Sequence, residues 1–453
     1  MPKTNTGNNN SGYLQRITMA HTNPSDAIEL SSYYVPDNKQ DVVKVYNDSF
    51  SNQEQIFPED QLRVKKPFFK NFTDSFKRVE PPRLDPTLTV MERSNILASH
   101  SQLKRRLHGR HLQMIAIGGA IGSGLFVGSG TALRHGGPAS VLISWILSGS
   151  MMYCTTQALG EMAVAFPVSG CYVQYNSRFL SPALGFAMAW NYTLNWFVSL
   201  PLELVSASIT IKFWNKDINS AAWVSIFYVI VVLINLFGVR GYGEAEFCLS
   251  LIKVLTIISF IILAVIMDCG GVPTSKEGYI GTKYWRDPGA FNNGFKGLCS
   301  VFTTSAFSFA GTEMIGLAAA ETSNPRKTLP SATKQVFWRI TLFYILSLLL
   351  VGFLVPYTDP RLLSSSSVDA SASPFVISIE NARIKGLPSV MNAVIMISVI
   401  SVGNSAVYAT SRCLVSLSEQ GFGPRIFGYI DREGRPLVGV GITLAVVVFV
   451  LVI

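Results

Sequence analysis

The chain has 453 residues, of which 49% are hydrophobic and only 14% are charged. A soluble protein of this size carries about a quarter charged residues, so the composition argues against a soluble globular protein. The formal net charge is +9. Lysine and arginine beside anionic lipid explain this charge better than nucleic acid does, because no basic block interleaved with aromatic residues occurs.

The first hundred residues differ in composition from the rest of the chain. They are rich in Asn, Ser, Asp and Pro and lack sustained apolar periodicity. Such a segment cannot bury enough apolar surface to fold, so we predict that residues 1–100 form a disordered tail. Residues 1–55 also lack the apolar core of a cleavable signal peptide. The first apolar span is therefore expected to direct membrane insertion.

Apolar runs of about 20 residues, the length that a bilayer-spanning helix requires, begin near residue 112. We predict spans at residues 112–134, 138–162, 183–213, 221–239, 243–268, 294–319, 335–356, 387–411 and 438–453. The ninth has no flanking anchor and barely reaches across the hydrocarbon, which leaves eight complete spans and one cut span. The predicted fold class is an all-α polytopic membrane protein.

Basic residues beside the spans predict the orientation of the chain. Lys104, Arg105, Arg106 and Arg110 precede the first span, so the positive-inside rule places the N-terminal tail in the cytosol. The loops after spans six and eight then fall on the same side. They carry these basic residues: Arg326, Lys327, Lys334, Arg412, Arg425, Arg432 and Arg435. The loop after span five is also basic but lies outside, so the bias is modest.

A glycine cluster at Gly118–Gly124 interrupts the first span. Glycine costs about 1 kcal/mol relative to alanine in a helix interior, so this density marks a place where the helix can open. The G-x-x-x-G spacings of Gly118 with Gly122 and of Gly124 with Gly128 leave a close-packing face as an alternative. A dinucleotide-binding loop is excluded, because the motif fails at Val127 and no strand precedes it.

The sixth span is interrupted in the same way at Phe307–Glu313, which holds a glycine, two hydroxyl groups and a carboxyl group. Two interrupted spans, five apart, indicate a transporter built from inverted repeats. Broken helices expose backbone N–H groups that attract a carboxylate and C=O groups that attract an ammonium. A zwitterion matches both, so amino acids are the predicted substrate class.

Charged residues within the spans are the next candidates: Glu161, Glu203, Lys253 and Glu313. Each would cost roughly 2.5–3.5 kcal/mol or more if it faced lipid at the bilayer centre, so they are expected to face the bundle interior. Glu161 lies at a span end and is interpreted as an interface residue. For Lys253 a structural ion pair remains an alternative to proton exchange. Glu244 and Glu246 are predicted to lie near the cytosolic surface.

Other classes of site receive no support from the sequence. The six cysteines form no C-x-x-C pair, and neither an H-E-x-x-H nor a G-x-S-x-G pattern occurs. We therefore expect no metal site and no enzymatic activity. Tryptophans in the spans, such as Trp196, are interpreted as packing or interface residues.

Several strings in the chain resemble those of a known family. They are Arg110–Gly124, Pro201–Val205, Gly241–Phe247, Phe307–Glu313, Gly403–Ser405 and, in the tail, Asp74–Arg78. The sequence from about residue 70 resembles the fungal amino-acid permeases of the amino acid–polyamine–organocation superfamily, and is most similar to the general amino-acid permeases. This resemblance implies a LeuT-type fold of two inverted five-helix repeats, usually within twelve helices. Residues 101–268 would form the first repeat and residues 269–453 a second repeat truncated in its fourth helix. The fold would thus be C-terminally incomplete, with about nine of twelve helices.

The resemblance also implies roles for individual residues. The backbone at Ile121, Gly122, Ser123 and Gly124 would hold the substrate carboxylate, and the carbonyl groups of Ala120, Phe307 and Ala310 would face its amino group. Phe307 matches an aromatic gate, Ser308 and Gly311 belong to the same substrate-binding segment, and Glu203 is a candidate pocket wall. Glu313 and Lys253 are the candidates for gating and proton coupling, with Lys253 placed where sodium-coupled relatives hold a cation.

The resemblance implies a secondary active transporter that takes up amino acids with protons, with broad specificity, across the plasma membrane. Protons would be the coupling ion and no other cofactor is expected. An amino-acid sensor that signals with little flux is the alternative, because it would share the same pocket. Expected partners are the substrate, the lipid bilayer and the ubiquitination and endocytosis machinery acting on tail lysines such as Lys3, Lys39 and Lys44. Nucleic acid is not expected.

Overall fold

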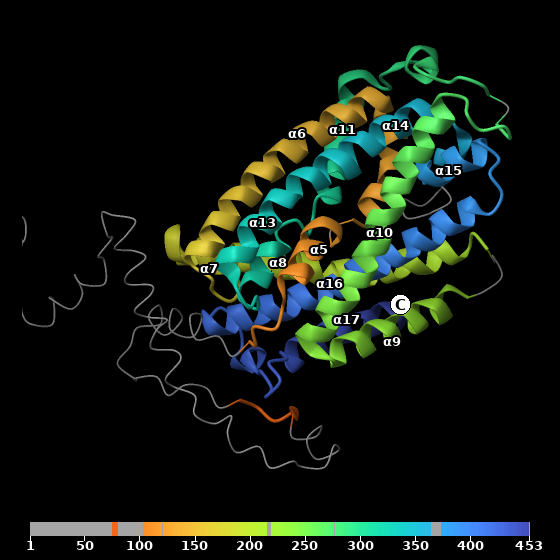
Figure 1. Ribbon diagram of the computed structural model, residues 1–453. Coiled ribbons are helices and arrows are strands. Elements are labelled where there is room, and N and C mark those ends of the chain that lie inside the picture. Colours follow the sequence, from red (N-terminus) through yellow and green to blue (C-terminus); the bar gives the residue numbers. More distant parts are fainter. Residues whose placement is uncertain are drawn as a thin grey trace, which may run out of the picture. The chain divides into compact units, whose positions relative to one another are not determined.

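The computed structural model describes residues 75–79, 103–119, 121–214, 219–275, 277–363 and 373–452. Within these ranges the regular structure is helical, apart from two isolated β-bridges. The predicted tail lies outside the described residues except for Ser75–Val79. In Figure 1 the helices α6, α11 and α13 run side by side, and α11 and α13 both pack against α6.

The helices in chain order are α5 (Gly109–Gly118), η2 (Gly124–Gly128), α6 (Ser129–Ala165), α7 (Tyr172–Phe179), α8 (Pro182–Ile211), α9 (Ser220–Leu236), α10 (Gly238–Asp268), η3 (Trp285–Gly289), α11 (Gly294–Ser308), α12 (Met314–Ala319), α13 (Pro325–Trp338), η4 (Arg339–Leu346), α14 (Ser347–Leu354), η5 (Pro360–Leu363), α15 (Pro374–Asn381), α16 (Leu387–Glu419), η7 (Arg425–Gly428) and α17 (Leu437–Val452). Five helical stretches of the described residues are long and apolar enough to cross a membrane: η2 with α6, α8, α10, α13 through α14, and α16. The apolar helices α9 and α17 are shorter.

Each of the predicted spans overlaps a helix of the described residues. The first and second predicted spans are joined at Gly137. Its φ of 78° is not helical, and the chain turns there before Pro138. Span one is divided between α5 and η2, and span six between α11 and α12. The prediction of an all-helical membrane protein whose first and sixth spans are interrupted is therefore confirmed.

Some boundaries were wrong. Arg412 was assigned to the loop after span eight, but α16 continues to Glu419, and Arg412 is buried there in an ion pair of 2.7 Å with Glu321. Lys334 likewise lies in a helix, because α13 begins at Pro325. The helices α7 and α15 were not predicted, since each has only 8 residues and lies in a connection between spans.

Glycines shape the second break and permit the close approach between the two breaks. Gly311 lies in the middle of the second break and has a φ of 90°, a backbone conformation that residues with a Cβ rarely adopt. A Cβ added to Gly124 would lie 2.7 Å from the Cα of Ser308, and one added to Gly122 would lie 2.6 Å from Val402. The glycines of the first span therefore permit close packing, as the G-x-x-x-G spacing predicted, beside the point where the regular helix ends at Gly118.

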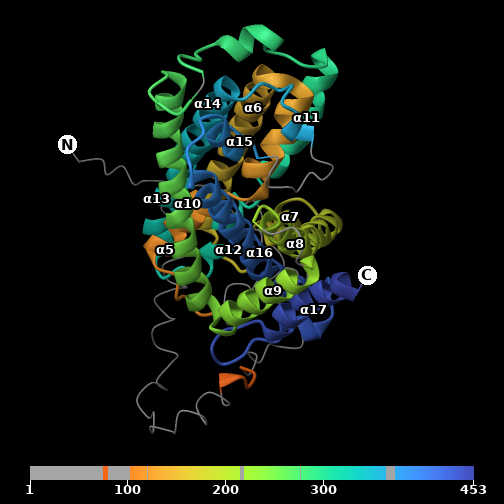
Figure 2. The same ribbon diagram turned by 90° about the vertical axis from the view of Figure 1, so that its right-hand side faces the viewer.

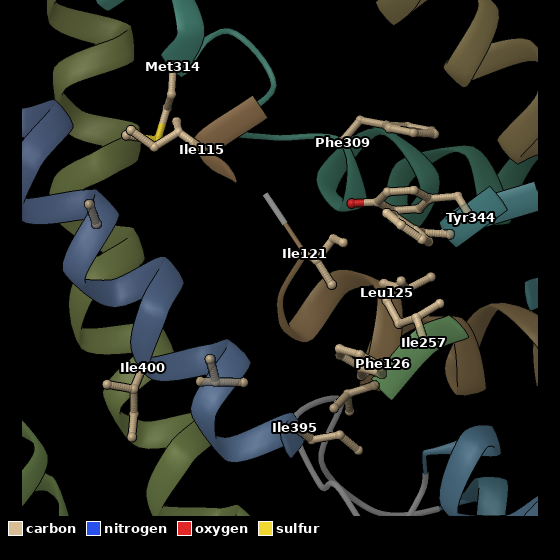
Figure 3. Packing of buried hydrophobic residues seen from close by; sticks show 14 of the residues in the cluster. Ile115, Ile121, Leu125, Phe126, Ile257, Phe309, Met314, Tyr344, Ile395 and Ile400 are labelled. Carbon is tan, nitrogen blue, oxygen red and sulfur yellow. The ribbon is translucent and has the colours of Figure 1, made fainter. Parts of the chain in front are cut away.

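The hydrophobic core packs around the first break. Ile121, Leu125 and Phe126 are fully buried, and Figure 3 shows them between side chains of α10 and α16 such as Ile257 and Ile395. The ring of Phe126 also meets that of Phe375 in α15 at 5.3 Å between centroids. This packing fixes the position of η2, which begins where the break ends.

The segment Ser75–Val79 binds the connection between η7 and α17. The N–H of Val79 donates to the carbonyl of Ile430 at 3.0 Å, and Arg435 donates to the hydroxyl of Ser75 at 2.9 Å. Arg435 also pairs with Asp431 at 2.6 Å. In Figure 2 α17 lies beside α9, against which it packs. The segment before the first span is thus attached to the connection that precedes the last described helix.

Candidate substrate site at the two helix breaks

The two breaks meet at one cavity. Its lining residues come from both breaks, α8 and α16: Gly122, Ser123, Gly124, Asn195, Trp196, Ser199, Glu203, Phe307, Ser308, Ala310 and Val402. The cavity volume is about 30 Å³, which is room for one or two water molecules. An amino acid therefore requires the lining elements to move apart.

Glu203 of α8 is the ionisable group of this lining. It is only 2% exposed, and its Oε1 accepts a hydrogen bond of 2.8 Å from the hydroxyl of Ser123. Its Oε2 is buried and has no hydrogen-bond partner among the described residues. Trp196, on the same helix face, has a buried Nε1–H without a partner as well. An acceptor oxygen of Glu203 is thus available beside the first break.

The backbone at the breaks supplies groups of opposite polarity. The helix that begins at Gly124 leaves the N–H groups of its first turn without partners inside the helix. At the end of α11 the carbonyl group of Phe307 accepts the N–H of Ala310 at 3.1 Å, and the carbonyl group of Ser308 has no partner within the helix. Helix N-termini favour anionic groups and helix C-termini favour cationic groups. This arrangement can hold a small zwitterion, with each end against the terminus that suits it.

The structure brings together most of the predicted substrate-binding residues. Seven of them line the cavity: Gly122, Ser123, Gly124, Glu203, Phe307, Ser308 and Ala310. Ile121 instead packs its side chain into the hydrophobic core. Gly311 does not line the cavity, and its N–H donates to the Glu313 carboxylate at 3.1 Å. Ala120 lies outside the described residues.

Four lining residues were not predicted: Asn195, Trp196, Ser199 and Val402. Trp196 had been interpreted as a packing or interface residue. A signal for two of them was present, because Asn195 and Ser199 precede the predicted Glu203 at intervals of four residues and therefore share one face of a helix with it. Val402 carries no such signal, since an apolar residue in an apolar span is indistinguishable from core.

Lys253 of α10 lies at the end of α5. It is fully buried, and its Nζ donates to the carbonyl of Gly118 at 3.0 Å and to the hydroxyl of Ser401 at 2.7 Å. Its Nζ is 3.8 Å from the Oε1 of Glu246. Glu246, which was predicted near the cytosolic surface, is fully buried within the helix bundle and accepts from Ser401 as well. Seven residues, about two helical turns, separate Glu246 from Lys253, so both lie on one face of α10.

The side chains of Glu244 and Glu161 both reach the surface of the described helices. Glu244 is exposed and pairs with Arg110 at 2.5 Å. Glu161 is exposed near the end of α6.

Glu313 closes the second break. Its carboxylate accepts the N–H of Gly311 and, at 3.0 Å, the hydroxyl of Tyr192 in α8. The carboxylate therefore links the turn at Gly311 to a neighbouring helix. Within the described ranges no three His, Cys, Asp or Glu side chains lie close enough together to hold a metal ion.

Relatives of known class match most of the chain. The chain is 60% identical over 399 residues to the general amino-acid permease GAP2 of Candida albicans, a match that covers 87% of this chain and 66% of that protein. It is 59% identical over 383 residues to the general amino-acid permease GAP1 of Saccharomyces cerevisiae, covering 83% and 63%. It is 50% identical over 424 residues to cationic amino acid transporter 1 of Schizosaccharomyces pombe, covering 91% and 69%. The chain thus spans about two thirds of the length of these curated relatives.

The fold has solved counterparts as well. A Na⁺-coupled sialic acid symporter in its substrate-bound outward-open state matches with a TM-score of 0.51 and 11% sequence identity, over 80% of each chain. This likeness supports the LeuT-type arrangement with an incomplete set of helices, and it shows the fold alone. The amino acid permease family model matches residues 111–453. The chain therefore belongs to the amino acid permease family, which is a family of membrane transporters and not of enzymes.

Proposed function

We propose that this protein takes up amino acids across the plasma membrane together with protons, with broad side-chain specificity and with its N-terminus in the cytosol. The observation that carries the proposal is the meeting of the two helix breaks at one cavity lined by Ser123, Glu203 and Phe307. The family membership supports the amino acid as substrate. The names of two relatives, both general amino-acid permeases, support broad specificity.

The substrate backbone would bind to the peptide groups of the breaks. Its carboxylate would accept from the N–H groups at Gly122, Ser123 and Gly124, where the helix N-terminus favours negative charge. Its ammonium would face carbonyl groups at the break in span six, those of Phe307 and Ala310. These contacts use only atoms that all amino acids share, so they are compatible with broad specificity. Ala120 and Gly311 remain proposed members of the same segments.

Lys253 is the proposed proton-coupling group. Its ammonium donates to the last carbonyl of α5, that of Gly118. The gain or loss of a proton at Lys253 would therefore strengthen or weaken this hydrogen bond beside the first break. Glu313 is the second candidate, because its carboxylate holds the turn at Gly311. A positive charge moving inward gains about 2.3 kcal/mol per 100 mV, which is enough for about fortyfold accumulation.

The membrane orientation rests on charge. Arg326 and Lys327, in the first turn of α13, and Arg425, in η7, lie on connections that would share the side of the N-terminal tail. Lysine and arginine are enriched on the cytosolic side of short loops. The proposed substrate cavity would then open outward to load and inward to release, by movement of the broken helices against the remaining spans.

The test is uptake of labelled amino acids by cells that lack their own amino-acid permeases. The chain is expressed joined to the part of a curated relative that the match leaves uncovered, since the chain spans about two thirds of that relative's length. Ser123→Trp would fill the cavity and should abolish uptake. Ser225→Trp, at an exposed position of α9, is the matched control and should leave uptake within twofold. Unchanged uptake in the Ser123→Trp variant, at equal surface amount, would refute the placement of the site.

A further inference from the structure

A stretch of π-helix, η4, lies within span seven between α13 and α14. It begins at Arg339, and Tyr344 follows five residues later. Hydrogen bonds in a π-helix join residues five apart, so these two side chains lie on one face. Both are fully buried. Such bulges occur frequently at functional sites, which directs attention to what this face contacts.

Arg339 contacts both interrupted helices. Its Nη1 donates to the carbonyl of Ala116, in the last turn of α5, at 2.7 Å. Its Nη2 donates to the hydroxyl of Thr312, which lies in the break between α11 and α12. One guanidinium group from a third helix therefore joins the break of span one to the break of span six.

Tyr344 holds the other side of the second break. Its hydroxyl donates at 2.9 Å to the carbonyl of Ser308, the last residue of α11. Its ring packs on that of Phe309, with the centroids 4.7 Å apart, and Figure 3 shows the two rings together above Ile121 and Leu125. A carbonyl that the interrupted helix leaves without a helical partner thus receives a donor from η4.

The chemistry of both side chains suits these positions. The C-terminus of a helix carries partial negative charge, so a buried cation at the end of α5 is stabilised there. Arginine presents several donors in a rigid planar fork and stays charged, whereas lysine offers one flexible ammonium. The fork contacts Ala116 and Thr312 with two separate nitrogen atoms, a geometry that the single nitrogen of a lysine ammonium does not reproduce. Breaking one arm leaves a buried charge less well paired, which is costly in a membrane interior.

We propose that Arg339 and Tyr344 are positioning residues that fix the two helix breaks relative to each other, and so set the affinity of the cavity for the amino-acid backbone. This rests on the proposed function, in which that cavity binds the substrate. Neither side chain lines the cavity. Their effect would pass through Ala116, Thr312 and Ser308 to the peptide groups of the breaks.

Three conservative variants test the proposal in the joined chain described above. Thr312→Val removes one arm of the arginine contact, Tyr344→Phe removes one hydroxyl, and Arg339→Lys keeps the charge but loses the fork. The Michaelis constant, KM, for labelled amino acid should rise about tenfold in each. The maximal rate per molecule at the cell surface should stay within about threefold. A residue that only supports folding would lower the surface amount and leave KM unchanged.

Matched controls remove the same groups elsewhere. Thr303→Val is at an exposed position of α11, and Tyr153→Phe is on α6, and both should leave KM within twofold. The double variant Thr312→Val with Arg339→Lys should raise KM no further than Arg339→Lys alone. Both changes break the same contact, that between the guanidinium group and the Thr312 hydroxyl. If Arg339→Lys does not reach the surface, Thr312→Val and Tyr344→Phe decide the question.

Three results would count against these proposals, and each is distinguishable from the others. An unchanged KM in both Thr312→Val and Tyr344→Phe, while Ser123→Trp abolishes uptake, would overturn the positioning role and leave the site in place. Full uptake by Ser123→Trp would instead overturn the proposed function. In the double variant, independent effects of Thr312→Val and Arg339→Lys would multiply the two rises in KM, so that their free energies add. That result would show that the two residues do not act through one contact, and would overturn the proposed link between the breaks.

Discussion

The hydroxyl of Ser123 in the first helix break donates to the carboxyl group of Glu203 at 2.8 Å, which joins the break to α8. Only one carboxyl oxygen is used, and the Oε2 of Glu203 is buried without a partner among the described residues. A buried carboxyl group with an unused oxygen beside a proposed substrate cavity is suited to bind the positive side chain of a basic amino acid.

Glu203→Gln should therefore change selectivity more than overall uptake. The amide keeps an acceptor for Ser123 but loses the negative charge, so KM for labelled arginine should rise about tenfold, which corresponds to about 1.4 kcal/mol. KM for labelled alanine should change less than threefold. The measurement is uptake of both substrates by the same cells.

Glu161→Gln is the control for this substitution, because Glu161 is exposed near the end of α6. It should leave both KM values unchanged. Equal rises for arginine and alanine in Glu203→Gln would contradict the assignment of Glu203 to the side-chain pocket and would favour a role in holding Ser123.

Lys253 should govern how uptake depends on external pH. Its ammonium binds the carbonyl of Gly118 at the end of α5, so Lys253→Met removes both the charge and the contact. Uptake by this variant should vary less between pH 5 and pH 8 than uptake by the unaltered chain. A pH dependence identical to that of the unaltered chain would remove Lys253 from the coupling role.

Glu246 provides a second measurement on the same pair. It lies 3.8 Å from Lys253 and, like it, is fully buried. Removing one member of a buried ion pair costs about 3–5 kcal/mol, because the other charge remains without compensation. Glu246→Gln should therefore lower the surface amount, and adding Lys253→Met should restore part of it. A double variant less stable than either single variant would argue against direct pairing.

The sequence predicted the helix breaks but not what holds them. Gly118–Gly124 and Phe307–Glu313 combine glycines with polar residues inside apolar runs, a local pattern that is visible without a structure. Arg339 was not identified as a candidate, since it lies near the predicted start of span seven and nothing in its neighbourhood indicates contacts with Ala116 and Thr312. These contacts join residues far apart in the chain, and a helical period alone does not reveal them.

Glu246 illustrates the same limit. A position near the start of an apolar run suggested the membrane surface, but α10 begins at Gly238 and its first turns are already packed against α5. Whether a side chain near the end of a span is buried in the protein thus depends on which neighbouring helices cover it. The face of α8 that carries Glu203 and Ser199 was accessible from spacing, whereas the assignment of that face to the cavity required the structure.

Alanine at Gly124 should separate the two breaks. Its Cβ would lie 2.7 Å from the Cα of Ser308, which is backbone and cannot rotate away. Overpacking of this kind costs about 1–3 kcal/mol, and here it displaces the site itself. Gly124→Ala should lower uptake at least tenfold. The control is Gly441→Ala in α17, where an added Cβ meets nothing within 4 Å. Equal uptake by the two variants would show that the breaks tolerate separation.

Glu433, in the connection before α17, should make stability fall in acid. Burial alone would raise the pKa of its carboxyl group, but the opposing effects of Lys104 and Arg106, at 3.4 and 2.7 Å, lower the pKa overall. A carboxyl group whose pKa is lower in the folded state stabilises the fold above its ordinary pKa, near 4.3. This contribution is then lost as the pH falls through the lower, folded-state value. The expected loss is less than about 1 kcal/mol, because the pair is partly exposed.

Thermal unfolding of the purified protein between pH 7 and pH 3.5 measures this loss. Glu433→Gln should lower the unfolding temperature at pH 7, and the difference from the unaltered chain should shrink as the pH falls toward 3.5, because protonation of the carboxyl group removes the charge that pairs with Lys104 and Arg106. Glu161 is exposed and has no ion pair among the described residues, so Glu161→Gln should produce no such difference between the two pH values. If Glu433→Gln lowered the unfolding temperature equally at both pH values, the side chain would act through packing. Its ion pairs with Lys104 and Arg106 would then not be what fastens the start of the first span to the connection before α17.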